Sequence, residues 1–300
     1  MQIAQTFFHT EKIPIYQPFS YFVKKITFRK PLDKTKKVWY NNRIVKRKTN
    51  RYYKRRKMRM KVILVDTEGL LNVSAFNVAY LVVNLPDCRI IHEGNLVIFP
   101  NIWDNLVASQ DSKNPDITPN LSRLLTNNIE NIFNNLSEYT IIKSRNGLAM
   151  HFRNLFKKYP DISRFYAFNV SFDKNILSNS MGETVFNAIF SGFSFHDIQT
   201  MFFFTHCNNI EYIRFCYKNG FLTAKGNCNT TAETFYRYYT KNPKYREKHL
   251  ALDDVMMEFE LFQSAITIDE SVETSPKKLW LLLNKLYDKN DYDLIMEMLE

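Results

Sequence analysis

The alternation of apolar and polar positions along the chain predicts an α/β domain. Short runs rich in β-branched, aliphatic and aromatic residues predict five strands, at residues 62–68, 74–84, 89–99, 163–170 and 192–197. Apolar residues spaced three and four apart predict helices at residues 122–133, 147–158, 171–181, 209–219, 230–239 and 249–266. The first three strands follow one another and should be antiparallel, whereas the later strands alternate with helices and should be parallel. We therefore expect one mixed five-stranded sheet flanked by helices.

Local signals predict where several helices begin and end. Ser171 is expected to cap the helix after the fourth strand, and Thr230 with Glu233 predicts a capping box. Pro160 and Gly220 are expected to end the helices that precede them. Residues 279–300 have the apolar spacing of one or two short amphipathic helices. We expect this tail to pack on the core, with docking against a protein partner as the alternative.

The first predicted strand ends in two acidic residues. In the segment KVILVDTEG, Asp66 and Glu68 point to one face because side chains alternate along a strand, and Thr67 points to the other. Two neighbouring carboxylates repel each other unless a cation lies between them. Taken alone, the pattern also fits a strand that ends in an ordinary polar turn at Gly69.

Three further residues with suitable chemistry stand at the ends of later elements. Asp173 lies in the first turn of the helix after the fourth strand, and Asp254 in the first turns of the last core helix. His249 precedes Asp254 by five residues, about 140° more than one helical turn, so the histidine should come from the segment before the helix. The alternative is that Asp254 caps the helix and His249 is an exposed loop residue. Asp197, which ends the fifth strand, is expected to be a structural or capping acid.

Charge is concentrated in one segment of the chain. Residues 24–61 hold 18 basic residues and one acid, whereas residues 62–300 hold 22 basic and 28 acidic residues. The net charge of +11 therefore belongs to a basic arm on a mildly acidic body. Lysines and arginines interleaved with Tyr52 and Tyr53 suit nucleic acid, because cations contact phosphates and aromatic rings stack on unpaired bases. The alternative is a solvated tail without a binding role.

Composition argues against several classes of protein and site. The chain has seven glycines and contains neither G-x-G-x-x-G nor G-x-x-x-x-G-K, so the common nucleotide-binding loops are not expected. Its four cysteines form no C-x-x-C pair, which argues against a zinc knuckle and is typical of reduced thiols in the cytoplasm. No apolar run is long enough to span a membrane. The abundance of Asn, Lys, Ile, Phe and Tyr suggests an AT-rich genome, so we expect the cytoplasm of a bacterial or phage-infected cell.

The acids and the histidine occur in the order found in a known family. The segments DTEG at residues 66–69, NVSFD at residues 169–173 and HLALDD at residues 249–254 resemble the three motifs of the DEDDh, or DnaQ-like, 3′–5′ exonucleases. This family belongs to the ribonuclease H-like superfamily. The resemblance covers residues 60–266. Phe168 stands where the second motif often has a histidine, which is a departure from the family pattern.

The resemblance implies a fold and a set of roles. It implies a ribonuclease H-like exonuclease fold and two Mg²⁺ or Mn²⁺ ions, which are the ions that hard oxygen ligands select. Asp66 would contact both ions. Glu68 and Asp254 would complete the ligands of the first ion, and Asp173 would hold the second. His249 would act as the general base toward the attacking water.

Domain organisation and substrate are expected from the same features. We expect a basic and aromatic extension at residues 1–57, an exonuclease domain at residues 58–268 and a helical tail at residues 269–300. The expected activity releases nucleoside monophosphates from the 3′ ends of nucleic acid, with single-stranded DNA favoured. An exoribonuclease that processes RNA and a non-catalytic nucleic-acid-binding accessory protein are the alternatives. The residues expected to contact nucleic acid are Leu70, Asn169, Arg43, Lys46, Arg47, Lys48, Arg51, Tyr52, Tyr53, Lys54, Arg55, Arg56 and Lys57.

Overall fold

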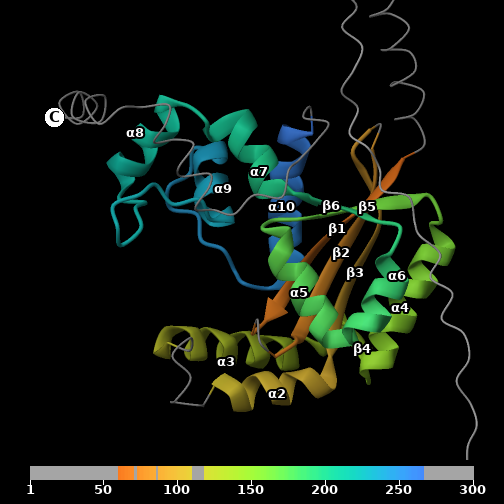
Figure 1. Ribbon diagram of the computed structural model, residues 1–300. Coiled ribbons are helices and arrows are strands. Elements are labelled where there is room, and N and C mark those ends of the chain that lie inside the picture. Colours follow the sequence, from red (N-terminus) through yellow and green to blue (C-terminus); the bar gives the residue numbers. More distant parts are fainter. Residues whose placement is uncertain (1–59, 71–72, 86, 110–117, 267–300) are drawn as a thin grey trace, which may run out of the picture. The chain divides into compact units, whose positions relative to one another are not determined.

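The computed structural model describes residues 60–70, 73–85, 87–109 and 118–266, which all belong to one compact unit of the chain, Tyr52–Glu300. They form a six-stranded sheet in the order β4-β3-β2-β1-β5-β6 (Figure 1). Its strands are β1 (Lys61–Gly69), β2 (Ala75–Asn84), β3 (Arg89–Ile98), β4 (Thr140–Ile142), β5 (Ile162–Ala167) and β6 (Ser194–Asp197). The α-helices are α2 (Phe99–Ser109), α3 (Pro119–Asn134), α4 (Arg145–Lys158), α5 (Val170–Met181), α6 (Glu183–Phe190), α7 (Ile198–Phe202), α8 (Ile210–Asn219), α9 (Ala232–Thr240) and α10 (Ala251–Ala265). A short 3₁₀-helix, η1 (Leu136–Glu138), and a π-helical turn, η2 (Phe203–Cys207), complete the described elements.

The strand β1 lies in the interior of the sheet. It pairs antiparallel with β2 and parallel with β5, while β2 pairs antiparallel with β3 and β5 pairs parallel with β6. Its residues Val62 to Val65 are fully buried because helices cover both faces, which explains the unbroken apolar run in the sequence. The predicted mixed α/β architecture, in which the first three strands follow one another and pair antiparallel, is confirmed.

The sheet has six strands rather than the five expected. The additional strand, β4, pairs parallel with β3 at the edge of the sheet. It is three residues long, and two of these residues are exposed. So short a segment lacks the repeating apolar positions by which longer strands are recognised in a sequence.

Helices cover both faces of the sheet and one of its ends (Figure 1). The helices α4, α5 and α6 pack on the face that includes Ile63 and Val65. The helices α7 to α10 pack on the opposite face, which includes Val62 and Leu64. The helices α2 and α3 pack on β2 and β3 near the C-terminal end of β1. None of the described helices is long and apolar enough to cross a membrane.

The helix α5 begins earlier than predicted. Its N-cap is Asn169, in the left-handed conformation with φ 59°, and not Ser171. The backbone N–H of Asn169 donates a hydrogen bond to Oδ1 of Asp197, at 3.0 Å, which helps to hold this conformation. A contact between residues so far apart in the sequence overrides the local preference for serine as a cap.

The start of α9 also differs from the prediction. Its N-cap is Thr231, whose hydroxyl accepts a hydrogen bond from the backbone N–H of Thr234. The capping box expected between Thr230 and Glu233 is therefore wrong, and Glu233 pairs with Arg237 instead. The predicted helix ends are confirmed, since α4 ends two residues before Pro160 and α8 ends at Gly220 in the left-handed conformation.

Candidate active site

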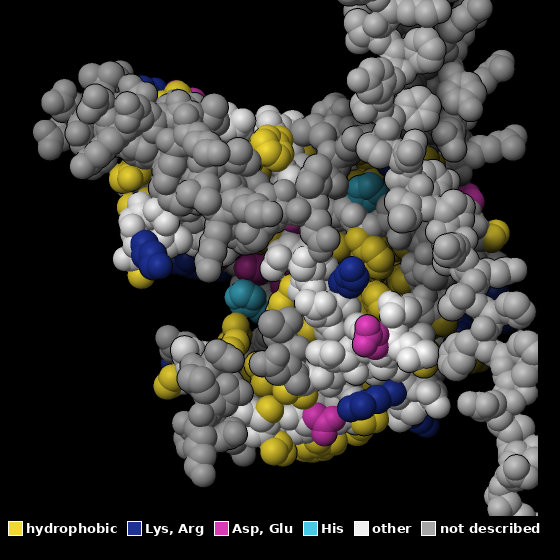
Figure 2. All heavy atoms as spheres, viewed as in Figure 1, with side chains coloured by type: hydrophobic (Ala, Val, Ile, Leu, Met, Phe, Trp, Pro, Cys, Tyr) yellow, Lys and Arg dark blue, Asp and Glu magenta, His cyan; other side chains and the backbone are white. Residues whose placement is uncertain are grey.

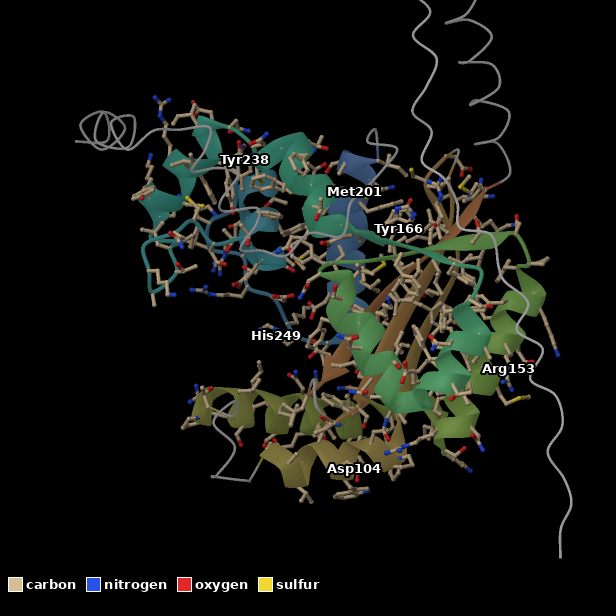
Figure 3. All side chains as sticks on the ribbon, viewed as in Figure 1. Asp104, Arg153, Tyr166, Met201, Tyr238 and His249 are labelled. Atoms are coloured by element: carbon tan, nitrogen blue, oxygen red, sulfur yellow. The ribbon has the colours of Figure 1, made fainter. Side chains whose placement is uncertain are left out.

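Three of the predicted site residues meet at the C-terminal end of β1. One potential ligand atom each from Glu68, His249 and Asp254 lies within 4.8 Å of the other two. Glu68 comes from β1, and Asp254 from the first turn of α10, which packs on the face toward which Glu68 points. His249 lies two residues before α10, between α9 and α10, as the helical geometry predicted (Figure 3). On the face shown in Figure 2, the surface is hollowed above α3, with histidine and acidic side chains at its edge.

The site continues to the opposite face of the sheet through Thr67. This side chain faces α5 and donates a hydrogen bond of 2.8 Å to Oδ1 of Asp173. Asp173 is 2% exposed, and its charge acts on the carboxyl group of Asp66. The group within 4.8 Å does not include Asp66 or Asp173, but the charge of Asp66 acts on Asp254 and that of Asp173 acts on Glu68.

Glycine at position 69 lets the two neighbouring strands approach closely beside the acids. The pairing of β1 with β2 is irregular between Glu68 and Gly69. A Cβ atom on Gly69 would lie 2.5 Å from the carbonyl oxygen of Ser74, which is closer than atoms in contact can come. Gly69 is therefore required by this close approach, and the strand end that presents Glu68 depends on it.

Burial raises the pKa of all four acids, and the charges of their neighbours in the cluster raise it further for Asp66, Glu68 and Asp254. Burial, followed by the charges of Asp173 and Glu68, raises the pKa of Asp66 well above its ordinary range. Burial raises the pKa of Asp173 to about 8. Burial, with the charge of Asp66 next in importance, raises the pKa of Asp254 to about 9. The pKa of Glu68 is also raised, first by burial and then by the charge of Asp254.

Two more acids, not singled out from the sequence, adjoin the cluster. Glu258 is 3% exposed, and its Oε2 accepts a hydrogen bond from the backbone N–H of Phe168. Burial and then the charge of Asp66 raise its pKa. Glu247 precedes His249 by two residues, and burial raises its pKa to about 7. The sequence holds a signal for Glu258, because it lies four residues after Asp254 and hence on the same face of α10.

The arrangement of these oxygen atoms fits divalent cations. Among the residues that the structure describes, no Lys or Arg forms an ion pair with Asp66, Glu68 or Asp254. Oδ2 of Asp66 and Oδ1 of Asp254 are buried without a hydrogen-bond partner in this part of the chain. A buried carboxylate oxygen without a partner is costly, and a bound cation removes that cost. Carboxylate oxygens suit Mg²⁺ or Mn²⁺, which are the ions that the resemblance implies.

The imidazole of His249 is in a state that accepts protons. Burial lowers its pKa from the ordinary value of 6.5, although the charge of Glu233 opposes this effect. The ring is therefore neutral at neutral pH and has a nitrogen lone pair available. Its main chain adopts the left-handed conformation, with φ 56°, at a cost of about 1–2 kcal/mol for a residue other than glycine.

Leu70 and Asn169 lie beside the site, and the structure records their backbone contacts. The backbone N–H of Leu70 donates to Oδ1 of Asn105 at 2.8 Å, and that of Asn169 donates to Asp197. Asp197 also caps α7, as expected of a structural acid. A role of Leu70 or Asn169 in contacting nucleic acid stays a prediction. The other residues expected to contact nucleic acid, within residues 43–57, and the tail at residues 279–300 lie outside the described residues.

Known proteins resemble this chain only distantly. No protein-family model and no curated protein matches it. Among similar solved structures, E. coli exonuclease I in complex with a dA16 oligonucleotide is 13% identical, with a TM-score of 0.38, over 79% of this chain and 45% of that chain. Exonuclease I in its apo form gives the same identity and TM-score over 80% and 47% of the two chains. The zinc-bound exonuclease I–ssDNA complex is 12% identical, with a TM-score of 0.36, over 70% and 40%.

The matched region spans less than half the length of these exonuclease I chains. At identities of 12 to 13% and TM-scores below 0.4, they carry no inference about activity. The function is therefore inferred from the residues of the site itself.

Proposed function

We propose that this protein is a divalent-metal-dependent 3′–5′ exonuclease that releases nucleoside monophosphates from nucleic acid, with single-stranded DNA ends favoured. The observation that carries the proposal is the convergence of Glu68, His249 and Asp254 within 4.8 Å, with Asp66 and Asp173 beside them. Buried acids without a cation repel one another, and phosphodiester-cleaving enzymes use such clusters to hold metal ions. The motif order that resembles the DEDDh family supports the 3′–5′ direction.

Each carboxylate would have a ligand role in this reaction. Glu68 and Asp254 would hold one divalent ion, Asp173 would hold a second, and Asp66 adjoins both sets of ligands. When bound, these ions supply positive charge next to the scissile phosphate and its leaving oxygen. The hydroxyl of Thr67 keeps the carboxylate of Asp173 oriented by occupying its Oδ1.

His249 would act as the general base. Its neutral imidazole takes a proton from the water whose oxygen attacks the phosphorus, and the bond from phosphorus to the 3′ oxygen of the preceding nucleotide breaks. That 3′ oxygen leaves with the remaining chain and takes up a proton from solvent. Because His249 comes from the segment before α10, it approaches from a different element than the carboxylates of Glu68 and Asp173.

One assay tests the activity and separates the possible substrates. End-labelled single-stranded DNA, double-stranded DNA and RNA are each incubated with Mg²⁺, Mn²⁺ or EDTA. Shortening from the 3′ end with release of mononucleotides, with either ion and not with EDTA, is the expected result. Faster cleavage of RNA would identify the exoribonuclease alternative, and binding without cleavage would identify the accessory-protein alternative.

Substitution at Asp66 tests the site. Asp66→Ala should abolish hydrolysis while binding to nucleic acid persists. Asp253→Asn is the matched control, since Asp253 lies next to Asp254 but pairs with Lys248 through a 2.7 Å contact. This control should retain hydrolysis. Full activity in Asp66→Ala would refute the assignment.

A further inference from the structure

The main chain at His249 depends on contacts from other elements. Its φ of 56° lies in the left-handed region, which residues other than glycine occupy only where the surrounding structure enforces it. The segment from α9 to α10 has no regular secondary structure between residues 245 and 250. The direction of the imidazole is therefore set by whatever holds the peptide groups of this segment.

One contact reaches His249 itself. Nδ2 of Asn128, on α3, donates a hydrogen bond of 2.6 Å to the carbonyl oxygen of His249. Asn128 is 6% exposed, so water competes little for this bond. Holding that carbonyl fixes the peptide plane that follows His249 and, with it, the ψ angle of the residue. Asn128 thereby restricts the direction in which the side chain of His249 leaves the backbone.

A second asparagine holds the next part of the segment from the sheet. Oδ1 of Asn77, on β2, accepts a hydrogen bond of 3.1 Å from the backbone N–H of Ala251. Its Nδ2 donates to the carbonyl oxygen of Leu96, which determines the orientation of the amide. Asn77 lies directly opposite Glu68 in the pairing of β1 with β2. The chain after His249 is thus tied both to α3 and to the strand beside an acid of the site.

Two hydrogen bonds hold the part of the segment that precedes His249, and neither of them reaches His249 itself. Nε of Arg237 donates to the carbonyl oxygen of Tyr245, at 2.8 Å. The backbone N–H of Glu247 donates to Oε1 of Glu233, at 3.1 Å. These bonds tie the earlier residues to α9. Among the contacts that the structure describes for this segment, the hydrogen bond from Asn128 is the one made to a main-chain atom of His249.

We propose that Asn128 is a positioning residue for the general base, acting through the carbonyl oxygen of His249. The proposal rests on the proposed function, since it gives His249 its role in proton transfer. In the proposed reaction, Asn128 touches neither the substrate nor the ions. It keeps the imidazole aimed at the attacking water, and small misplacements of a catalytic group reduce the rate strongly.

The test compares Asn128→Leu, which keeps the branched shape of the side chain and loses the donor, with Asn127→Leu at the neighbouring exposed position of α3. Asn128→Leu should lower kcat about tenfold or more, with KM nearly unchanged, and Asn127→Leu should match the wild type. Asn128→Ala serves as a second variant if the leucine disturbs folding, which the thermal midpoint reports. An unchanged kcat in a folded variant at position 128 would overturn the proposal.

A double-substitution experiment separates positioning from a general structural role. If Asn128 acts only through the imidazole, adding Asn128→Leu to His249→Ala should produce no further loss of kcat beyond that of His249→Ala alone. A further tenfold loss in the double variant would show that Asn128 supports the site as a whole, and would overturn the proposal.

A measurement without metal or substrate tests the positioning role of Asn128 separately from the proposed nuclease activity. The imidazole resonances of His249 in the metal-free protein are assigned by their loss in His249→Asn. They should shift or broaden in Asn128→Leu and stay in place in Asn127→Leu. If the wild type hydrolyses no nucleic acid, the proposed function fails, and this spectrum still tests the contact. Unmoved resonances in Asn128→Leu would overturn the positioning role even if the wild type is active.

Discussion

The hydroxyl of Thr67 and the carboxylate of Asp173 are joined by a 2.8 Å hydrogen bond across the end of β1. Thr67 stands between the two acids of the strand, so its side chain points away from theirs and toward α5. Burial raises the pKa of Asp173 to about 8, and the hydrogen bond from Thr67 opposes that rise. Thr67 thus orients Asp173, which lies on the face of the sheet opposite to the one toward which Asp66 and Glu68 point.

Replacing Thr67 by valine removes this hydrogen bond with little change in shape. Cation affinity should fall about tenfold, because a hydrogen bond to a charged group contributes about 1.5 kcal/mol. Titration calorimetry with Mn²⁺ measures the loss, and Thr67→Ser, which keeps the hydroxyl, is the control. Equal affinities for the valine variant and the wild type would show that Thr67 does not support the ligand role of Asp173.

Replacing Asp254 by asparagine should make the metal-free protein more stable and inactive. At pH 8, folding without metal either buries the charge of Asp254 or takes up a proton at its raised pKa, and asparagine removes both costs. The free energy of unfolding should rise by more than about 1.4 kcal/mol, the equivalent of one pKa unit. Urea denaturation in EDTA measures this change.

The neighbouring Asp253 provides the control for that measurement. Asp253→Asn removes an exposed ion pair with Lys248, so its free energy of unfolding should change by less than about 1 kcal/mol. A loss of stability in Asp254→Asn, with a small change in Asp253→Asn, would contradict the repulsion inferred within the cluster.

The raised pKa values predict how stability depends on pH. In the folded, metal-free protein, Asp173 and Asp254 keep protons up to pKa values of about 8 and about 9, whereas unfolded aspartates release theirs near a pKa of about 3.9. The folded state therefore binds more protons over this interval, and stability falls as the pH rises through it. Thermal midpoints in EDTA should therefore decrease from about pH 5 to about pH 9.

Divalent cations should reverse that trend, because they bind the ionised acids. The increase in thermal midpoint produced by saturating Mn²⁺ should be larger at about pH 8 than at about pH 5, where protons compete for the same oxygens. An equal increase at both pH values would show that Mn²⁺ does not bind at these carboxylates.

Deleting residues 1–57 should weaken binding to single-stranded DNA in a salt-dependent way. The deletion removes 16 of the 18 basic residues between residues 24 and 61. If a third of those 16 contact phosphates, the slope of log affinity against log salt should become shallower by about 4. Fluorescence anisotropy at several salt concentrations measures the slope. A full-length variant with glutamine in place of the arm's lysines and arginines separates loss of charge from loss of length. Unchanged affinity at low and at high salt would refute a binding role for the arm.

The repeating apolar pattern predicted most of the fold, because buried strands and amphipathic helices leave long periodic signals. The edge strand β4 was missed because three residues carry no period. The cap of α5 was misplaced because the position of Asn169 depends on Asp197, 28 residues later in the chain. Glu258 was overlooked although it lies four residues after Asp254, a spacing that places both on one helix face.

The sequence by itself determined which ionisable side chains stand at the ends of the elements. The alternation along β1 requires Asp66 and Glu68 to share a face, and the five-residue interval requires His249 to stand outside α10. Only the tertiary structure decided how these groups are held. The contacts from Thr67 to Asp173 and from Asn128 to His249 join residues 106 and 121 positions apart. Local periodicity carries no information about such pairs, because the packing of separate elements brings them together.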